Sequence, residues 1–439
     1  MGLKILFVTL GCPKNTVDSE NMAYLLSEKG YEITNDPMLA DAVIINTCGF
    51  IHDAKEESVE TIMQAVMLKK ERSELRIIVT GCLAQRYAQE LENEIPEVDL
   101  FVGTGNFYEI AETLERSEKI QLGDIDAPIE ETGRVLTTPA YYAYLKLAEG
   151  CNKHCTYCII PKIRGKQRSR KMEDILQEAQ RLADSGVKEL ILIAQDTGEY
   201  GTDLYGERKL SELLGKLDRI SGLNWIRLLY VYPETIDDAL IDVMANAKKI
   251  LHYIDIPFQH ISDRVLKRMG RLTDSSAINH LIDRLRIRIP DIVIRSTFIV
   301  GFPQETKEDV SELADFLRSA RLDRVGIFRY SKEEGTPAAE MSGQISETEK
   351  QCRYDELMAI QEAVSDSILE QYRGCTMETV IEEEAEEGVY CGRTRIDAPE
   401  IDGVIYVYSD SPLEIGEFYP VTVEDSMEYD LIGRYTKQN

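Results

Sequence analysis

The sequence predicts an α/β protein in three parts: an N-terminal domain around a parallel sheet, a central partial β/α barrel and a small C-terminal β-barrel. In the first 120 residues, short apolar runs alternate with amphipathic helical patterns, which is typical of a parallel sheet covered on both faces. The same alternation resumes near residue 142 and continues to about residue 340. After residue 372 only short alternating runs separated by turns remain, which indicates an all-β unit.

Three apolar runs of the N-terminal part each lead into a cysteine. The runs are Ile5–Leu10, Ala42–Asn46 and Arg76–Thr80, and the cysteines are Cys12, Cys48 and Cys82. Because the carboxyl ends of parallel strands share one edge of a sheet, these three thiols are expected to converge. They can hold a metal cluster, or they can be three buried structural cysteines, which is a common place for this residue.

The central part contains six apolar runs of strand length, separated by helical patterns. The predicted strands are Tyr144–Ala148, Glu189–Ala194, Trp225–Val231, His252–Ile256, Ile292–Val300 and Arg324–Tyr330. Parallel strands with crossover helices fit a partial or full β/α barrel, whose site lies at the carboxyl ends of its strands. Residues 122–141, rich in proline, glycine, threonine and acidic residues, are predicted to link this part to the N-terminal domain.

The C-terminal part begins after a predicted long helix, 346–372, that stops at Gly374. Runs such as Gly403–Tyr408 and Phe418–Val423 predict a small all-β barrel. Residues 372–439 hold 16 acidic and 5 basic residues, a net charge near −11. A barrel that binds RNA should be basic, because phosphate contacts dominate such affinity.

Composition limits the class of protein further. The chain of 439 residues has a net charge of −28, which argues against broad nucleic-acid binding and suits a basic protein partner. No apolar run approaches the length of a membrane span, and no secretory leader is evident, so a cytoplasmic protein is expected. Nine cysteines against five histidines then favour thiolate metal sites over disulfides.

The strongest signal is a C-x3-C-x2-C run formed by Cys151, Cys155 and Cys158 directly after a predicted strand. On a helix these positions share one face, so three core cysteines are one alternative, and a zinc site is another. Loop-forming and polar neighbours instead favour a 4Fe–4S cluster. An electron-transfer cluster takes four cysteines, whereas three leave one iron free to bind a reactant.

This run resembles the signature of the radical S-adenosylmethionine (SAM) superfamily. The resemblance implies that the open iron binds SAM, which is cleaved to a 5′-deoxyadenosyl radical. It also implies that Tyr157 lies near the adenine. Gln195 and Asp196, at the end of the next predicted strand, lie on the same rim and could reach the nucleoside, although capping of the strand end is an equal alternative.

The N-terminal motifs and the domain order resemble the methylthiotransferases over nearly the whole chain. The matching segments are Gly11-Cys12-Pro13-Lys14-Asn15, Val17-Asp18-Ser19-Glu20, Asn46-Thr47-Cys48 and Thr80-Gly81-Cys82. The resemblance implies a methylthiotransferase domain (1–121), a linker (122–141), a radical SAM domain (142–370) and an OB-like TRAM barrel (371–439). It further implies a second 4Fe–4S cluster on the first three cysteines, where the sulfur is methylated, and two SAM molecules per reaction.

Three features resemble the RimO-type branch, which β-methylthiolates an aspartate of ribosomal protein S twelve. They are Pro13-Lys14, the sequence Gln195-Asp196-Thr197, and Glu333-Glu334 in a position where tRNA-modifying relatives typically carry Arg-Pro. The acidic barrel favours the same branch, since it would repel tRNA and attract a basic ribosomal protein. The expected partners are that protein and an electron donor such as flavodoxin or ferredoxin. The alternatives are a tRNA adenosine methylthiotransferase and an iron–sulfur carrier or scaffold.

Three smaller features complete the interpretation. Lys162, Arg164, Lys166, Arg168 and Arg170 alternate, so an extended segment would place all five on one face. That face is a solvated surface, charge balance near a cluster, or a clamp on the substrate aspartate. Gly301-Phe302-Pro303-Gln304-Glu305-Thr306 resembles a family motif with glycine at the position of Gln304, and Thr306 with Asp309 predicts a helix cap. Cys352, Cys375 and Cys391 are assigned to structure.

Overall fold

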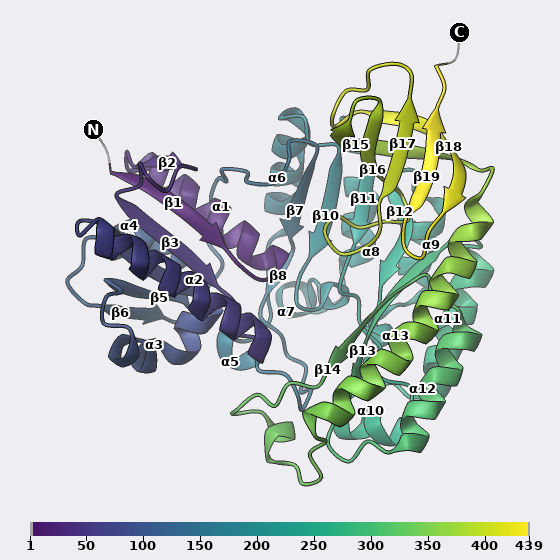
Figure 1. Ribbon diagram of the computed structural model, residues 1–439, viewed down its shortest axis with the longest axis horizontal. Coiled ribbons are helices and arrows are strands. Elements are labelled where there is room, and N and C mark those ends of the chain that lie inside the picture. The colour runs from purple at the N-terminus through teal and green to yellow at the C-terminus, as the bar shows by residue number, and fades with distance from the viewer. Residues whose placement is uncertain (1–2, 438–439) are drawn as a thin grey trace.

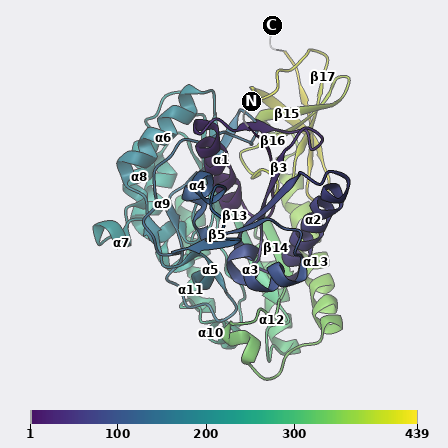
Figure 2. The same ribbon diagram turned by 90° about the vertical axis from the view of Figure 1, so that its left-hand side faces the viewer.

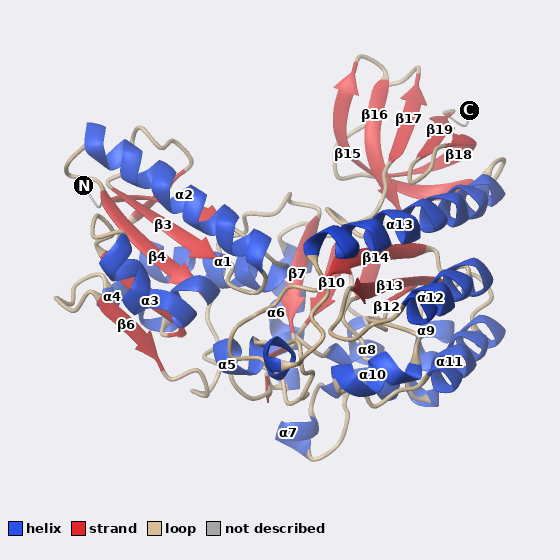
Figure 3. Cartoon of the chain, turned by 60° about the horizontal axis from the view of Figure 1, so that its bottom comes forward, coloured by secondary structure: helices blue, strands red, loops and turns tan. Residues whose placement is uncertain are grey.

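The computed structural model describes residues 3–437 and contains two six-stranded parallel sheets and a closed five-stranded barrel (Figure 1). The three units can be distinguished in Figure 3, with the N-terminal sheet at the left and the barrel at the upper right. The predicted α/β class with a C-terminal β-barrel is confirmed. No helix within residues 3–437 is long and apolar enough to cross a membrane.

The N-terminal sheet has the strand order β2-β1-β3-β4-β5-β6, with every pair parallel. Its strands are β1 (Lys4–Thr9), β2 (Glu32–Thr34), β3 (Ala42–Thr47), β4 (Arg76–Gly81), β5 (Leu100–Gly105) and β6 (Ile120–Gly123). β2 is added on one side of β1, whereas β3, β4, β5 and β6 are added on its other side. The direction in which successive strands are added therefore reverses between β1 and β3. Ligands of doubly wound sheets bind at such a switch point, outside the carboxyl ends of the strands.

Helices cover both faces of this sheet, as the alternating pattern predicts. They are α1 (Pro13–Glu28), α2 (His52–Glu71), α3 (Cys82–Glu94) and the short α4 (Ile110–Thr113). Val43, Ile45 and Val79 pack against α2 and α3, whereas their neighbours Ile44 and Ile78 pack against α1 and α4. Figure 2 shows α2 and α3 on one side of the strands and α1 and α4 on the other.

The central sheet is an open sheet of six parallel strands in the order β14-β13-β12-β11-β10-β7, hence a partial barrel. Its strands are β7 (Tyr142–Lys146), β10 (Glu189–Ile193), β11 (Trp225–Leu228), β12 (Ile250–Asp255), β13 (Val293–Val300) and β14 (Arg324–Arg329). All six correspond to predicted strands. A separate two-stranded ladder, β8 (Ala148–Glu149) with β9 (Arg168–Ser169), lies beyond the end of β7.

One face of the central sheet packs against helices in the largest apolar core of the described chain. The helices of this domain are α5 (Ile160–Arg164), α6 (Met172–Asp184), α7 (Thr202–Tyr205), α8 (Leu210–Leu217), α9 (Asp238–Asn246), α10 (Asp263–Met269), α11 (Ser275–Arg288), α12 (Lys307–Ala320) and α13 (Glu347–Leu369). The opposite face carries Tyr142, Tyr144, Ile191 and Tyr253, which share a second core with the C-terminal barrel.

The C-terminal barrel closes in the order β15-β16-β17-β19-β18. Its strands are β15 (Thr376–Glu386), β16 (Val389–Thr394), β17 (Ile405–Ser409), β18 (Phe418–Ser426) and β19 (Leu431–Tyr435). Its loop between β16 and β17 reaches the inner face of the central sheet, where Tyr142 donates a hydrogen bond to Glu400 at 3.1 Å and Tyr253 donates one to Asp402 at 2.6 Å. The barrel therefore covers the amino-terminal half of that face and leaves the carboxyl ends of the strands to the N-terminal domain.

The segment between the first two domains is irregular beyond β6, but it is firmly packed. Arg134 binds the carboxylates of Glu20 in α1 and Glu178 in α6, and Val135 donates its backbone N–H to the carbonyl of Glu20 at 3.1 Å. This segment therefore ties the N-terminal domain to the central domain.

Candidate active site at the junction of two domains

Cys12, Cys48 and Cys82 lie at the carboxyl ends of β1, β3 and β4. Cys12 precedes α1, Cys48 follows β3, and Cys82 is the first residue of α3. A Cβ on Gly11 would lie 2.8 Å from the Cys48 Cβ and 3.1 Å from its Sγ, and Gly11 has a φ of +89°. Only glycine meets both demands. The glycine before Cys12 therefore allows the ends of β1 and β3 to meet at the switch point.

Burial favours the protonated thiols of Cys48 and Cys82 in the absence of a metal. Burial, with the neighbouring Cys82 and Cys12, raises the pKa of Cys48 to about 12. Burial also raises the pKa of Cys82, although Arg164 opposes the shift. The mutual effect on pKa reflects how close the three sulfurs are. A cationic metal centre would displace the thiol protons, as sulfur-ligated metals do.

The second triplet lies in a loop after β8. Residues 151–155 are irregular and a turn follows, so the alternative of three core cysteines on one helix face is wrong. Thr156 anchors this loop, because its N–H donates to the carbonyl of Met269 at 2.9 Å and its carbonyl accepts from Ala338 at 2.9 Å. Burial raises the pKa of Cys151 to about 11 and that of Cys158 to about 12.

Polar groups already surround the sulfurs of this loop. The backbone N–H of Lys153 lies 3.4 Å from the Cys151 Sγ, and a guanidinium nitrogen of Arg271 lies 3.9 Å from the Cys155 Sγ. The hydroxyl of Tyr232 is 3.8 Å from the same Cys155 sulfur, and Arg271 stacks on the Tyr232 ring. These donors fit a sulfur that carries negative charge, as a metal-bound thiolate does.

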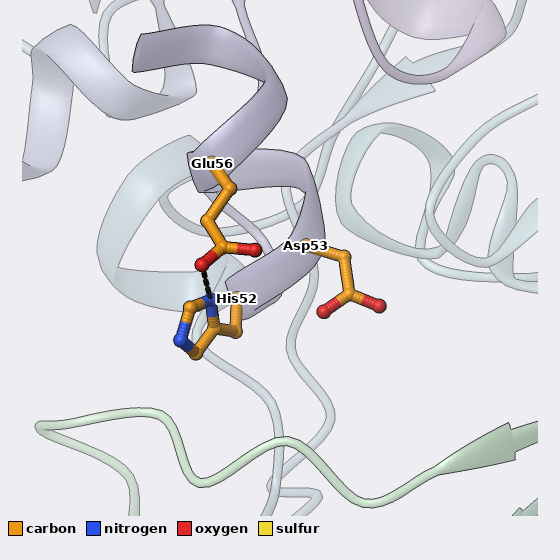
Figure 4. A group of neighbouring side chains, drawn as sticks. All are labelled: His52, Asp53 and Glu56. Carbon is orange, nitrogen blue, oxygen red and sulfur yellow. Dashed lines mark ion pairs between the residues drawn. The ribbon is translucent and has the colours of Figure 1, made fainter. Parts of the chain in front are cut away.

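The spacing of the sulfurs also bears on the kind of metal. Within residues 3–437, neither triplet has all its sulfurs within 4.8 Å of one another, the spacing that suits one ion. A cubane of four irons holds its ligands farther apart. His52, Asp53 and Glu56 do meet that spacing (Figure 4), but they are exposed on one turn of α2, which is common without a metal.

Buried hydrogen-bond acceptors lie at the ends of the central strands. Gln195 Oε1, both carboxylate oxygens of Asp196 and Gln259 Oε1 accept no hydrogen bond from the described residues. Asp196 is only 2% exposed, and its nearest cation, Lys153 Nζ, is 3.4 Å from Oδ2. Burial raises the pKa of Asp196 to about 6. Unsatisfied buried acceptors are costly, so this group is suited to a ligand that brings donors.

Asp196→Asn is expected to stabilise the ligand-free, cluster-loaded protein by up to about 3 kcal/mol above pH 6. The native pKa of Asp196, about 6, lies above its unfolded value of about 4. Stability is therefore lost as the pH rises from about 4 to about 6, where the unfolded state ionises more readily than the native state, and the loss is complete above about pH 6. The gain should therefore shrink as the pH falls from 6 towards 4. Chemical unfolding at pH 5 and pH 8 measures the gain in the free energy of unfolding. If Asp196→Asn and the wild type were equally stable at pH 8, Asp196 would not be a strained buried carboxylate. Glu199→Gln, which removes a more exposed partner of Lys153, is the control.

The two triplets meet at the domain junction. Cys82 shares a buried cluster with Ile159, the residue after Cys158, and with Ile163 in α5. Arg164 donates to Asp18 at 2.6 Å and lies 3.5 Å from the Cys82 Sγ. Figure 1 shows α1 of the N-terminal domain beside β7 and β8 of the central domain. Each triplet is thus contributed by one domain, and both lie along the same interface.

The expectation that five basic residues share one extended face is wrong. Pro161 presets the φ of the first turn of α5, and Gly165, with a φ of +71°, reverses the chain after it. Arg164 and Arg170 are buried, whereas Lys162 and Lys166 are exposed. Arg170 binds Glu131 and Glu178 and so belongs to the packing of the linker segment.

Two further contacts hold the N-terminal domain over the central one. The Lys14 ammonium lies 3.7 Å from the centroid of the Tyr230 ring, next to Cys12. The carboxylate of Glu333, which is only 2% exposed, binds Lys55 and Arg86 at 2.8 Å each. Arg86 also donates to the carbonyl of Gly49 at 2.6 Å, directly after Cys48. Sequence reasoning noted Lys14 and Glu333 as family features but gave neither a structural role.

The remaining predicted features have clear places. Tyr157 is half-buried against an apolar group with Met269 and Tyr330. Gln304 has a φ of +65°, a conformation that explains the glycine of the related motif. Thr306 and Asp309 form the predicted capping box of α12. Cys352 and Cys375 are exposed and Cys391 is half-buried.

Comparisons with known families agree with this division of the chain. Residues 4–103 match a family described as "Uncharacterized protein family UPF0004", residues 145–317 match the radical SAM superfamily, and residues 374–435 match the TRAM domain. The fold is similar to a radical SAM methyltransferase, TsrM, from Kitasatospora setae, at a TM-score of 0.57 and 14% identity, covering 88% of this chain and 79% of that one. At this identity the likeness concerns the fold alone.

Fold and families together define an iron–sulfur enzyme of the radical SAM class, a methylthiotransferase with a TRAM domain. Proteins called ribosomal protein uS12 methylthiotransferase RimO are 52% identical in Lachnoclostridium phytofermentans, over 98% of this chain and 99% of the relative, and 50% identical in Clostridioides difficile, over 98% of each. The chain belongs to the RimO family.

Proposed function

We propose that this enzyme β-methylthiolates an aspartate of ribosomal protein uS12, with two 4Fe–4S clusters and two SAM molecules per product. Cys12, Cys48 and Cys82 hold the first cluster, which is the sulfur site. Cys151, Cys155 and Cys158 hold the second, which binds SAM. The observation that carries the proposal is the buried cluster shared by Cys82, Ile159 and Ile163, because it brings the two triplets to one interface.

The second cluster with SAM would supply one-electron cleavage and a carbon radical, the chemistry needed at an unactivated C–H bond. The residues of the chain position the reactants. Asp196 and Gln195 offer buried acceptors for the hydroxyl and amino groups of SAM, and Tyr157 belongs to the loop of the second triplet. The buried apolar side chains of Ile159 and Ile163 would help to exclude water between the two clusters.

The substrate follows from the relatives and from charge. The relatives are named for ribosomal protein uS12, and ribosomal proteins are generally basic because they bind RNA. The exposed acidic residues of the β15–β16 hairpin, Glu383, Glu384 and Glu386, suit such a partner. We place the enzyme in the cytoplasm, where its substrate is made, with flavodoxin or ferredoxin as the electron donor. The domain boundaries proposed are 1–121, 142–370 and 371–439, joined by 122–141.

Reversing the charge of Glu383, Glu384 and Glu386 to lysine is expected to lower the affinity for uS12 by at least about tenfold at low salt, with a smaller difference at high salt. Glu382 is left unchanged, because it binds Arg393 at 2.9 Å and supports the fold. The matched control reverses Asp283, Glu312 and Glu356 on exposed helices of the central domain. Titration with labelled uS12 measures the affinity; equal losses in both triple variants would argue against the hairpin as the docking surface.

The proposal is tested by incubating reduced, cluster-loaded enzyme and SAM with uS12 and, separately, with tRNA. We expect a methylthio mass increase on an aspartate of uS12, unmodified tRNA and formation of 5′-deoxyadenosine. Modified tRNA would favour the other methylthiotransferase branch. Absence of 5′-deoxyadenosine would favour a carrier or scaffold.

A further inference from the structure

Arg164 occupies an unusual place, because it is a central-domain residue in contact with a cysteine of the N-terminal domain. It lies six positions after Cys158, at the end of α5, and is 3% exposed. Its guanidinium Nη2 is 3.5 Å from the Cys82 Sγ. The same residue therefore follows the second triplet in sequence and contacts the first triplet in space.

The two terminal nitrogens of Arg164 have different partners. Nη1 donates to Asp18 at 2.6 Å and to Glu149 at 3.1 Å. Nη2 donates to the Asn15 side-chain oxygen at 2.5 Å and faces Cys82. The nitrogen that faces the sulfur is thus bound to no carboxylate, so its second proton is available to a thiolate.

The surroundings fix this orientation. Lys146 binds both Asp18, at 2.6 Å, and Glu149, at 3.1 Å, so two cations and two carboxylates balance in a buried quartet. Glu149 also accepts from Gln195 at 2.7 Å. Removing any member would leave a buried charge unpaired, which holds the guanidinium plane in place. The planar guanidinium directs Nη1 to the carboxylates of Asp18 and Glu149 and Nη2 to Asn15 and the Cys82 sulfur. The compact ammonium of lysine does not reproduce this fixed separation of donors.

We propose that Arg164 belongs to the hydrogen-bonding shell of the first cluster and raises the reduction potential of that cluster. This rests on the proposed function, since it requires a cluster on Cys12, Cys48 and Cys82. A cationic donor at a ligand sulfur stabilises the more negative, reduced form of an iron–sulfur cluster. In a dry interface that effect is strong, because little water screens it. Arg164 thereby makes the reduction potential of the first cluster depend on the docking of the central domain.

The test is a redox titration of each cluster, followed by electron paramagnetic resonance, in the wild type and in Arg164→Lys. The two triplet-to-alanine proteins assign each signal to its cluster. We expect a lower midpoint potential for the first cluster in Arg164→Lys and an unchanged potential for the second, which is the internal control. Arg168→Lys is the matched control, because Arg168 contacts the carbonyl of Ile125 and Asp126 rather than a sulfur.

A second measurement covers the case in which Arg164→Lys fails to assemble its first cluster. Protein lacking the second triplet and labelled with ¹⁵N-arginine should show a ¹⁵N hyperfine coupling to the remaining reduced cluster. Three results would overturn the proposed role of Arg164. They are the absence of that coupling, an unchanged midpoint potential of the first cluster in Arg164→Lys, and equal shifts of the potentials of both clusters. A wild type with a single cluster would instead refute the proposed function.

Discussion

Replacing Cys12, Cys48 and Cys82 by alanine is expected to abolish methylthiolation of uS12 while 5′-deoxyadenosine still forms. The first triplet lies at the switch point of the N-terminal sheet, apart from the loop of Cys151, Cys155 and Cys158 that would bind SAM. Radical formation needs only the second site, whereas sulfur insertion needs both. The expected loss of methylthio product is at least about 10³-fold, equivalent to about 4 kcal/mol of barrier.

The measurement is the ratio of methylthio product to 5′-deoxyadenosine. This ratio distinguishes a loss of sulfur insertion at the first site from a loss of radical formation at the second. The matched control replaces Cys352, Cys375 and Cys391 by alanine and should keep the wild-type ratio. The complementary variant, with Cys151, Cys155 and Cys158 replaced by alanine, should lose both products. Methylthiolation that persists without the first triplet would contradict the division of labour between the domains.

Glu189→Gln is expected to lower the free energy of unfolding by about 3–5 kcal/mol, the typical cost of stranding a buried charge. Glu189 lies between two buried arginines: Arg227 of β11 at 2.7 Å and Arg393 of the C-terminal barrel at 2.7 Å. Neutral glutamine would leave Arg227 without its carboxylate partner and Arg393 with Glu382 as its remaining one. Because Arg393 belongs to β16, the loss should also loosen the barrel from the central sheet.

Chemical unfolding and limited proteolysis between α13 and β15 measure this effect. Lys188→Met, which removes the exposed pair of Lys188 with Glu417, should cost less than about 1 kcal/mol and is the control. Burial alone would raise the pKa of Glu189, but Arg393 and Arg227 hold it below its usual value. The stabilisation is therefore present above the unfolded pKa of a glutamate and is lost as the pH falls through the native value. An equal stability of Glu189→Gln and wild type at pH 7 would contradict the docking role.

The sequence was sufficient to predict the strands with strong apolar runs and the ends at which the cysteines lie. It missed β2, β5 and β6, and β2 has only three residues, Glu32–Thr34, with one apolar side chain among them. The strand order was also hidden, because pairing between distant strands leaves no trace in local spacing. The strand order matters for the site, because it makes β1 and β3 neighbours and so places Cys12 and Cys48 on either side of the switch point.

The contacts between domains were the least predictable part of the site. The alternation of Lys162 to Arg170 suggested one extended face, but Pro161 and Gly165 divide the segment into a helical turn and a short strand. Arg164 and Cys82 are 82 positions apart, and nothing in either local pattern indicates the other. The nearest sequence signal for the buried charges at this junction was Glu149, an acidic residue at the end of an apolar run and directly before Gly150 and Cys151.

Iron and sulfide analysis of anaerobically prepared protein tests the central claim most directly. Two three-cysteine cubanes predict about eight irons and eight sulfides per chain, and about four of each when either triplet is replaced by alanine. A wild type with about four irons, or full iron content after loss of Cys12, Cys48 and Cys82, would contradict the account.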